Sequence, residues 1–186
     1  MLRESCPILR PRLPARAAAA HIRKANPGRA AMPDDLKSLI STAADAYGPG
    51  APNIATPVPG LAVVRATAPT APFRALYHPV VCVVAQGAKR VMSGDAVHDF
   101  GAGQSLIVGI DVPVTAQVVT ASPEAPYLAA AVDLDWAILR EVIDAADAAP
   151  AAEPPAPGIL VGAPDAALAD CMARLLRLTG EPAAVA

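Results

Sequence analysis

The histidines are the first residues whose type could carry chemistry. The sequence contains 3 of them, His21, His78 and His98. A metal centre on a β-strand commonly uses two histidines two positions apart, because side chains at i and i+2 share one face of the strand. Val80 and Phe100 occupy those positions here. We therefore predict no metal site and expect no cofactor.

Nucleophilic catalysis has little support in the sequence. Ser105 lies in the stretch 103–107, which lacks the closing glycine of a nucleophile elbow and has a strand-like pattern. Ser93, Asp95 and His98 are close in sequence, but neighbours within one hairpin do not form the geometry of a catalytic triad. We expect no catalytic residues and a protein that is not an enzyme.

The cysteines indicate a reducing compartment. Cys6, Cys82 and Cys171 are odd in number, far apart and without a CxxC pair. This pattern favours neither a disulfide framework nor a zinc site, and it is typical of a cytoplasmic protein. Cys82 lies within an apolar run, which predicts a buried and unreactive thiol.

Polar side chains at or beside predicted strands could instead contact a small molecule. The candidates are Tyr77, His78, Gln86, Lys89 and His98. Four of them also have a structural alternative: Gln86 in a turn, Lys89 as a charge on a sheet edge, Tyr77 as a core ring with a solvated hydroxyl, and His98 as a hydrogen-bonded or exposed histidine. Because successive side chains of a strand point to opposite faces, Tyr77 and His78 cannot both point inward.

The elements that position these residues are mostly short strands. Runs with a β-type pattern cover 61–67, 74–78, 80–85, 89–92, 96–100, 105–108, 113–119 and 127–134. The breaks between them contain glycine, proline or serine, which favour turns. Strands at this near-regular spacing predict a closed antiparallel barrel or jelly roll, and such barrels can hold a small ligand in the mouth.

Helical patterns flank the strands. We expect a short helix at about 35–47 and a second at 135–148, with Trp136, Leu139 and Ile143 on one face. After a short extended piece at 159–161, a last helix at 164–179 carries one apolar stripe. The stripe consists of Leu168, Met172, Leu175 and Leu176. It either packs on the barrel or contributes to a subunit interface.

Charge and composition divide the chain into segments. Residues 1–31 hold seven basic residues and one acid, whereas the remainder is acidic overall. We interpret 1–31 as a basic tail, disordered or upstream of the true start at Met32, and 32–55 as a helix and linker. The barrel is expected at 56–134, packing or dimerisation helices at 135–180, and a truncated end at 181–186. An acidic body disfavours contact with DNA, and no apolar run is long enough to cross a membrane.

Three motifs together resemble one known family. Tyr77, Pro79, Gln86, Gly87 and Lys89 stand at the positions of a Y-x-P-x-x-x-x-x-x-Q-G-x-K signature. Asp111 and Pro113 belong to a following D-V-P-V segment. The third motif contains Ser122, Pro123, Glu124, Pro126 and Tyr127. In this order and spacing, over residues 56–180, the chain resembles the N-terminal domain of AraC-type transcription regulators.

The resemblance implies a fold and a function. The fold is mainly β, a cupin-like antiparallel β-barrel or jelly roll followed by two α-helices. The function is sensing of an unidentified small-molecule effector and homodimerisation, in regulation of DNA-templated transcription. In the family a helix-turn-helix domain follows, and we expect DNA binding only if such a domain is supplied. Two alternatives stay open: a metal-dependent cupin enzyme, and a truncated partner that modulates full-length regulators.

Overall fold

The structure, a computed structural model, describes residues 35–48, 50, 52–145 and 158–181. The basic tail at 1–31, the linker at 149–157 and residues 182–186 lie outside the described residues, as does the expected end of the second helix at 146–148. Within the described residues, no helix is long and apolar enough to span a membrane.

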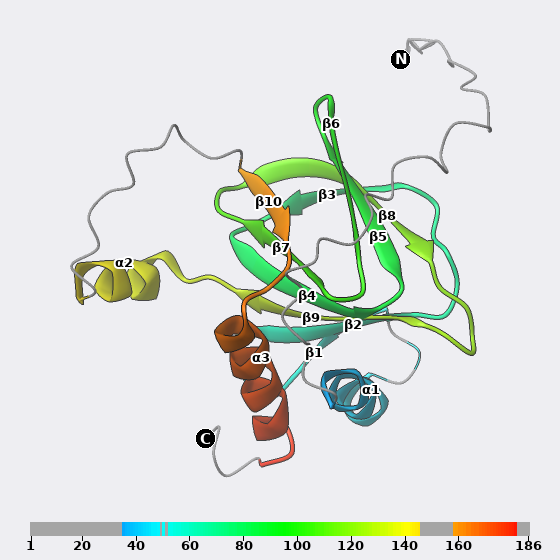
Figure 1. The fold of residues 1–186 in the computed structure, drawn as a ribbon, viewed down its shortest axis with the longest axis horizontal. Helices are drawn as coiled ribbons and strands as arrows, with labels where there is room; N and C mark the ends of the chain where they lie inside the picture. The colour runs from blue at the N-terminus through cyan, green and yellow to red at the C-terminus, as the bar shows by residue number, and fades with distance from the viewer. Residues whose placement is uncertain (1–34, 49, 51, 146–157, 182–186) are drawn as a thin grey trace, which may run out of the picture.

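The body consists of two antiparallel β-sheets that face each other (Figure 1). The strands are β1 (Asn53–Ala55), β2 (Leu61–Ala66), β3 (Phe73–Tyr77), β4 (Val80–Gln86), β5 (Ala88–Ser93), β6 (Ala96–Gly101), β7 (Gln104–Val108), β8 (Val112–Thr120), β9 (Tyr127–Asp133) and β10 (Ile159–Gly162). The six-stranded sheet has the order β1-β2-β9-β4-β7-β10, and the four-stranded sheet has the order β3-β8-β5-β6. The predicted mainly β, cupin-like architecture is confirmed.

One apolar core fills the space between the sheets. In β8 the alternate residues Val112, Val114, Ala116 and Val118 are buried there, while their neighbours are partly or fully exposed. This is the period of two that a strand with one buried face requires. The four-stranded sheet therefore presents its other face to solvent.

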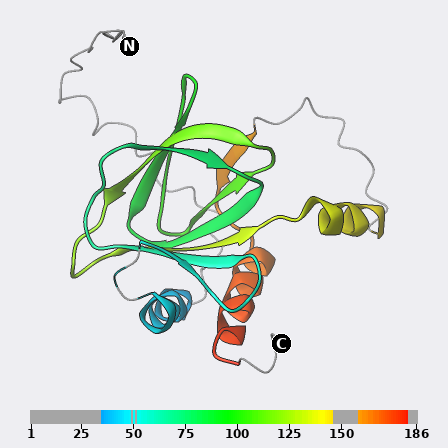
Figure 2. The same cartoon turned by 180° about the vertical axis from the view of Figure 1, so that it is seen from behind.

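A second core lies on the outer face of the six-stranded sheet. Helices α1 (Leu36–Tyr47) and α3 (Ala166–Leu178) cover that face, as both views show (Figures 1 and 2). Val83 of β4 and Leu128 of β9 point toward the helices, whereas Val84 and Ala129 point into the barrel. Strands buried on both faces need apolar residues at successive positions, which explains the unbroken apolar runs in β4 and β9.

The last helix packs on the barrel and on α1. Met172 and Leu176 are buried in the core beneath the sheet, and Leu168 and Leu175 pack against it. At the helix end, Arg177 forms an ion pair of 2.6 Å with Asp35, and the Tyr47 hydroxyl donates to the carbonyl of Thr179. The apolar stripe of this helix is expected either to pack on the barrel or to form a subunit interface. In the structure it packs on the barrel.

Two strands lie outside the range 56–134 that the sequence pattern predicts for the barrel. β1 pairs with β2, and β10 pairs with β7 at the opposite edge of the same sheet. Both are short, with 3 and 4 residues. Such segments are too short to show a period, and they become strands because a neighbouring edge offers hydrogen-bond partners.

The remaining helix, α2 (Trp136–Ala145), projects away from the barrel (Figure 1). None of its residues is buried. Trp136 is 50% exposed and Ile143 is 47% exposed, and Leu139 is partly exposed between them. The expected apolar face is present, but no described part of the chain covers it.

The start of α3 supports a stability prediction. The Asp165 carboxylate accepts a hydrogen bond of 2.7 Å from the Leu168 amide, which satisfies one of the free N–H groups of the first turn. We expect Asp165→Ala to lower the free energy of unfolding by about 1 kcal/mol in urea titrations. The control is Asp170→Ala, an exposed carboxylate within the same helix. Equal losses in the two variants would remove capping as the reason.

Candidate functional site

A small polar cluster interrupts the apolar interior of the barrel. We call Tyr77, Cys82, Lys89 and Tyr127 the interior cluster. Tyr77 ends β3 and Lys89 lies in β5, both in the four-stranded sheet, while Cys82 of β4 and Tyr127 of β9 belong to the other sheet. Tyr77, Cys82 and Tyr127 pack in the core between the sheets, and Lys89 reaches the Tyr77 ring. Four separate strands thus bring these side chains together.

The two tyrosine hydroxyls of the cluster lack partners. The Oη atoms of Tyr77 and Tyr127 are buried, and neither meets the geometry of a hydrogen bond with a described group. The Cys82 thiol interacts with the Tyr127 hydroxyl, but a thiol is only a weak hydrogen-bonding group. Buried polar groups in native proteins are nearly always hydrogen-bonded, so each exception calls for a physical reason. An unsatisfied buried hydroxyl costs about 1–3 kcal/mol of stability. A ligand with hydrogen-bonding groups would satisfy both.

Lys89 contributes a positive charge to the cluster. Its Nζ lies 5.4 Å from the centroid of the Tyr77 ring, within the range of a cation–π interaction. Among the described residues, no carboxylate forms an ion pair with it. In the four-stranded sheet its cross-strand neighbours are Phe100 and Val118, which are both buried and apolar. The ammonium therefore has an aromatic face as its partner.

Burial favours the neutral forms of the Cys82 thiol and the Tyr127 phenol. Desolvation raises the pKa of Tyr127 well above its ordinary value, and the adjacent Cys82 and Tyr77 act in the same direction. Desolvation also raises the pKa of the Cys82 thiol, although the charge of Lys89 opposes it. A thiol reacts as its thiolate, so Cys82 is unsuited to be a nucleophile near neutral pH. The cluster offers hydrogen bonds and charge, not covalent chemistry.

Residues of the sequence motifs hold Tyr127 in place. The Gln86 side chain donates a hydrogen bond of 2.8 Å to the carbonyl of Pro126, immediately before β9. Gly87 has φ +78°, and its Cα lies so close to the Tyr127 backbone that a Cβ would come within 2.9 Å of the Tyr127 Cα. Ser122 closes the preceding turn, since its Oγ accepts from the Ala125 amide at 3.0 Å. Gln86, Gly87 and Ser122 therefore position the strand start.

Other motif residues lie on the surface. His78 Nδ1 and Asp111 Oδ1 are 2.9 Å apart, and both side chains are more than 60% exposed. Tyr77 points inward and His78 outward, as strand alternation requires. The carbonyl of Pro79 accepts from the Leu134 amide at 2.9 Å and so ties β4 to the end of β9.

The turn between β8 and β9 also carries exposed motif residues. Pro123 and Glu124 are exposed there. A backbone hydrogen bond and the Ser122 side chain lower the pKa of the Glu124 carboxyl. Pro113 is likewise exposed, next to the buried Val112 at the start of β8. These residues shape turns and strand ends rather than the interior.

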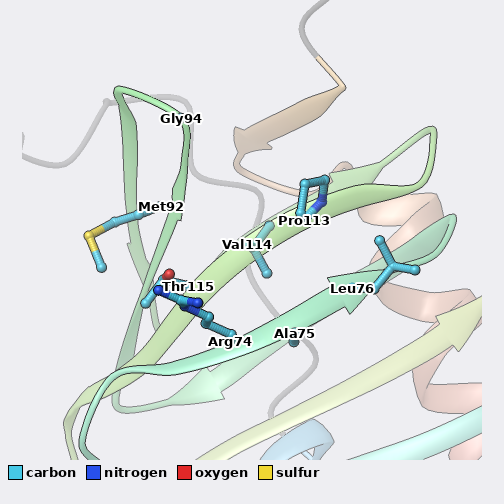
Figure 3. Close-up of a pocket in the computed structure, with 8 residues that line it drawn as sticks. All are labelled: Arg74, Ala75, Leu76, Met92, Gly94, Pro113, Val114 and Thr115. Atoms are coloured by element: carbon cyan, nitrogen blue, oxygen red, sulfur yellow. The ribbon is translucent and has the colours of Figure 1, made fainter. Parts of the chain in front are cut away.

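Two surface depressions lie outside the interior cluster. One, of about 560 Å³, lies on the outer face of the four-stranded sheet, where Arg74, Met92, Pro113 and Thr115 surround it (Figure 3). The other, of about 390 Å³, is lined by His98 together with residues of the β7–β8 loop and the start of β10. Among the described residues, no group of three or more histidine, cysteine or acidic side chains could hold a metal ion.

The structure thus separates the five predicted ligand contacts. Tyr77 and Lys89 meet in the barrel interior, His98 lines a depression, Gln86 braces a turn, and His78 lies on the surface. The two structural alternatives for the first pair are wrong. β5 lies between β8 and β6, so Lys89 is not on a sheet edge, and the Tyr77 hydroxyl is not solvated.

Sequence reasoning misses two members of the interior cluster. It assigns Tyr127 only to a structural motif, and it predicts Cys82 to be an inert buried thiol. Cys82 is indeed buried, but it lies beside Lys89 and Tyr127. The signal that could have found both is alternation: Cys82 shares its face with Val84, and Tyr127 shares its face with Ala129.

Two facing antiparallel sheets, with helices on one of them, define a cupin-like β-barrel domain. Residues 57–186 match the family model described as the AraC-type transcriptional regulator N-terminus. The chain therefore belongs to this family, as the three sequence motifs predicted. Membership indicates a regulatory domain rather than an enzyme. A search of curated proteins finds no match.

Solved structures with a similar fold include ToxT from Vibrio cholerae, with a TM-score of 0.48 and 7% identity over 62% of this chain and 46% of ToxT. A ToxT variant in its apo form has a TM-score of 0.42 and 5% identity over 66% of this chain and 47% of that one. A cupin-2 domain protein from Shewanella frigidimarina has a TM-score of 0.29 and 12% identity, over 40% of this chain and 69% of its own. The chain spans about half the length of ToxT.

Proposed function

We propose that this chain is the effector-binding and dimerisation domain of an AraC-type transcription regulator, and that a small-molecule effector binds at the interior cluster. The observation that carries the proposal is the pair of buried phenol hydroxyls, Tyr77 and Tyr127, without hydrogen-bond partners in the described chain. Membership of the regulator family supplies the biological role.

The effector is bound and not transformed in this proposal. The raised pKa values of Cys82 and Tyr127 make these two groups unsuited to attack or to remove a proton. DNA contact is expected only if a helix-turn-helix domain is supplied. The protein would then act in the cytoplasm, where a regulator meets both effector and DNA.

A metabolite panel tests effector binding. The panel contains sugars, amines, carboxylates, amides and aromatic compounds, each mixed with the full chain. A compound that binds only the folded state raises the melting temperature, by an amount that grows with its concentration. We expect at least one class to do so in the wild type and not in the double variant Tyr77→Phe/Tyr127→Phe. Stabilisation that is equal in both proteins would place the effector elsewhere.

Helix α2 supports the dimerisation part of the proposal. Trp136, Ile138, Leu139, Val142 and Ile143 follow one broad side of the helix, given 3.6 residues per turn. Ile138 is 61% exposed and Val142 is 58% exposed. An exposed apolar helix face of this kind is typical of an interaction surface. We propose that its partner is the same helix in a second copy of the chain.

Charge substitutions on α2 test this surface. We expect Ile138→Glu/Val142→Glu to weaken the dimer roughly 100-fold, because loss of two central apolar contacts at about 1.4 kcal/mol each costs about 2.8 kcal/mol of association free energy. Sedimentation equilibrium measures the change. Glu141→Gln, on the polar side of the helix, serves as the control and should leave the dimer intact. A wild-type chain that stays monomeric at high concentration contradicts dimerisation through α2.

A further inference from the structure

The interior cluster has more hydrogen-bond donors than acceptors. Each tyrosine hydroxyl can donate once, and a lysine ammonium has three donors and no acceptor. No member of the cluster is acidic. We propose that the effector presents an anionic oxygen group, with the chemistry of a carboxylate, to Lys89, Tyr77 and Tyr127. This inference rests on the proposed function and names the chemical class of its ligand.

The unpaired positive charge of Lys89 is the main observation in favour of an anionic ligand. Buried charges in proteins are usually paired, because transfer of an ion from water into an apolar core is costly. Lys89 is only partly exposed, has buried apolar neighbours across both strand pairs, and contacts the face of Tyr77. No described carboxylate pairs with it. A ligand with a negative charge would supply the missing counter-charge.

A carboxylate offers acceptors to all three groups. Its two oxygens accept several hydrogen bonds, and bonds to a charged donor or acceptor are stronger than neutral ones. A neutral alcohol or amide can pair with the phenols but leaves the ammonium without a counter-charge. Cys82 contributes only a weak donor or acceptor. The anionic class thus fits the cluster better than the neutral classes.

Small apolar side chains belong to the same core as the interior cluster. Ala116 and Ala129 are fully buried between the sheets, close to Val84 and Val91 in the same core. These small apolar side chains favour a compact apolar body attached to the anionic group. Short-chain and aromatic monocarboxylates, such as butyrate and benzoate, are therefore the probes of choice.

Other cations of the described barrel are weaker candidates. Arg90 is held by Asp99 through two hydrogen bonds of 2.6 and 2.7 Å, so its charge is already compensated. Arg74 is exposed beside the open depression on the outer face of the four-stranded sheet (Figure 3). Water solvates an exposed guanidinium, which removes the reason to require a bound anion. Arg74 nevertheless serves as a control.

The experiment compares charged and neutral isosteres on the full chain. Butyrate and benzoate are titrated in parallel with butyramide and benzamide, and binding is followed by the ring signals of labelled tyrosine. We expect the carboxylates to bind roughly 10- to 100-fold more tightly than the amides. Lys89→Met should abolish this preference, and Lys89→Arg should keep part of it. Lys37→Met and Arg74→Met should retain the wild-type preference.

The outcomes separate this inference from the proposed function. If the amides perturb Tyr77 and Tyr127 as strongly as the carboxylates do, the anionic class is wrong while the interior site stands. Loss of the preference in Arg74→Met overturns the assignment to Lys89. If neither series perturbs the two tyrosines, the anionic class is again wrong, and the broader panel decides whether another class binds. Failure of that panel as well overturns the proposed function.

Discussion

Gly87→Ala is expected to destabilise the domain by more than about 3 kcal/mol, since two costs combine at this position. Gly87 has φ +78°, a conformation that L-residues other than glycine adopt at a cost. An added Cβ would also lie 2.5 Å from the Thr120 carbonyl oxygen and 2.9 Å from the Tyr127 Cα. Both are backbone atoms, so neither can rotate away. Chemical denaturation measures the loss.

Gly94→Ala is the matched control for this variant. Gly94, at the β5–β6 turn, also has a positive φ, +55°, but an added methyl group there would meet no atom within 4 Å beyond its chain neighbours. Only the conformational cost remains, which is about 1 kcal/mol. A similar loss in both variants would show that backbone conformation alone matters at Gly87, and that the close approach to β9 does not.

Tyr127→Phe is expected to stabilise the domain by about 1–3 kcal/mol while it weakens effector binding. Removal of an unsatisfied buried hydroxyl relieves a desolvation cost and leaves the ring in place. The melting temperature of a chain of this size should rise by roughly 2–4 °C per kcal/mol. Gains in stability that accompany a loss of function are common where a site holds groups for a ligand.

Tyr47→Phe is the control variant, and its stability should change in the opposite direction. The Tyr47 hydroxyl donates to the Thr179 carbonyl and links α1 to the end of α3. Its removal deletes a satisfied hydrogen bond and should cost about 1 kcal/mol without any effect on ligand binding. A destabilised Tyr127→Phe variant would contradict the view that its hydroxyl lacks a partner in the folded chain.

Most of the barrel could be predicted from the sequence because its strands carry their own signals. β8 alternates apolar and polar residues, and β4 is an unbroken apolar run bounded by Pro79 and Gly87. By contrast, β1 has no such signal, and the extended piece expected at 159–161 becomes β10 through hydrogen bonds to the edge strand β7, a pairing that a short segment does not reveal. The packing of α3 likewise could not be predicted from its own sequence, because it depends on contacts with α1.

The interior cluster could be predicted only in part. Tyr77 and Lys89 stand out in the sequence because they are polar residues near strands. The register of the two sheets decides which other side chains join them, and the pairing of β4 with β9 includes a shift between Val84 and Gln86. Such a bulge changes which residues oppose each other across the strands. Alternation places Cys82 and Tyr127 on the inner faces of their strands, but Cys82 opposes Ala131 in the register, so their contact is not a cross-strand pair that the sequence could reveal.

The most direct test of the account uses the three tyrosines of the chain, Tyr47, Tyr77 and Tyr127, as reporters. With ring-labelled tyrosine, an effector that stabilises the protein is titrated and the three signals are assigned by single Tyr→Phe variants. Binding at the interior cluster predicts saturable shifts at Tyr77 and Tyr127 and none at Tyr47, which lies on α1 outside the barrel. An effector that stabilises the chain but leaves the signals of Tyr77 and Tyr127 unchanged would contradict it.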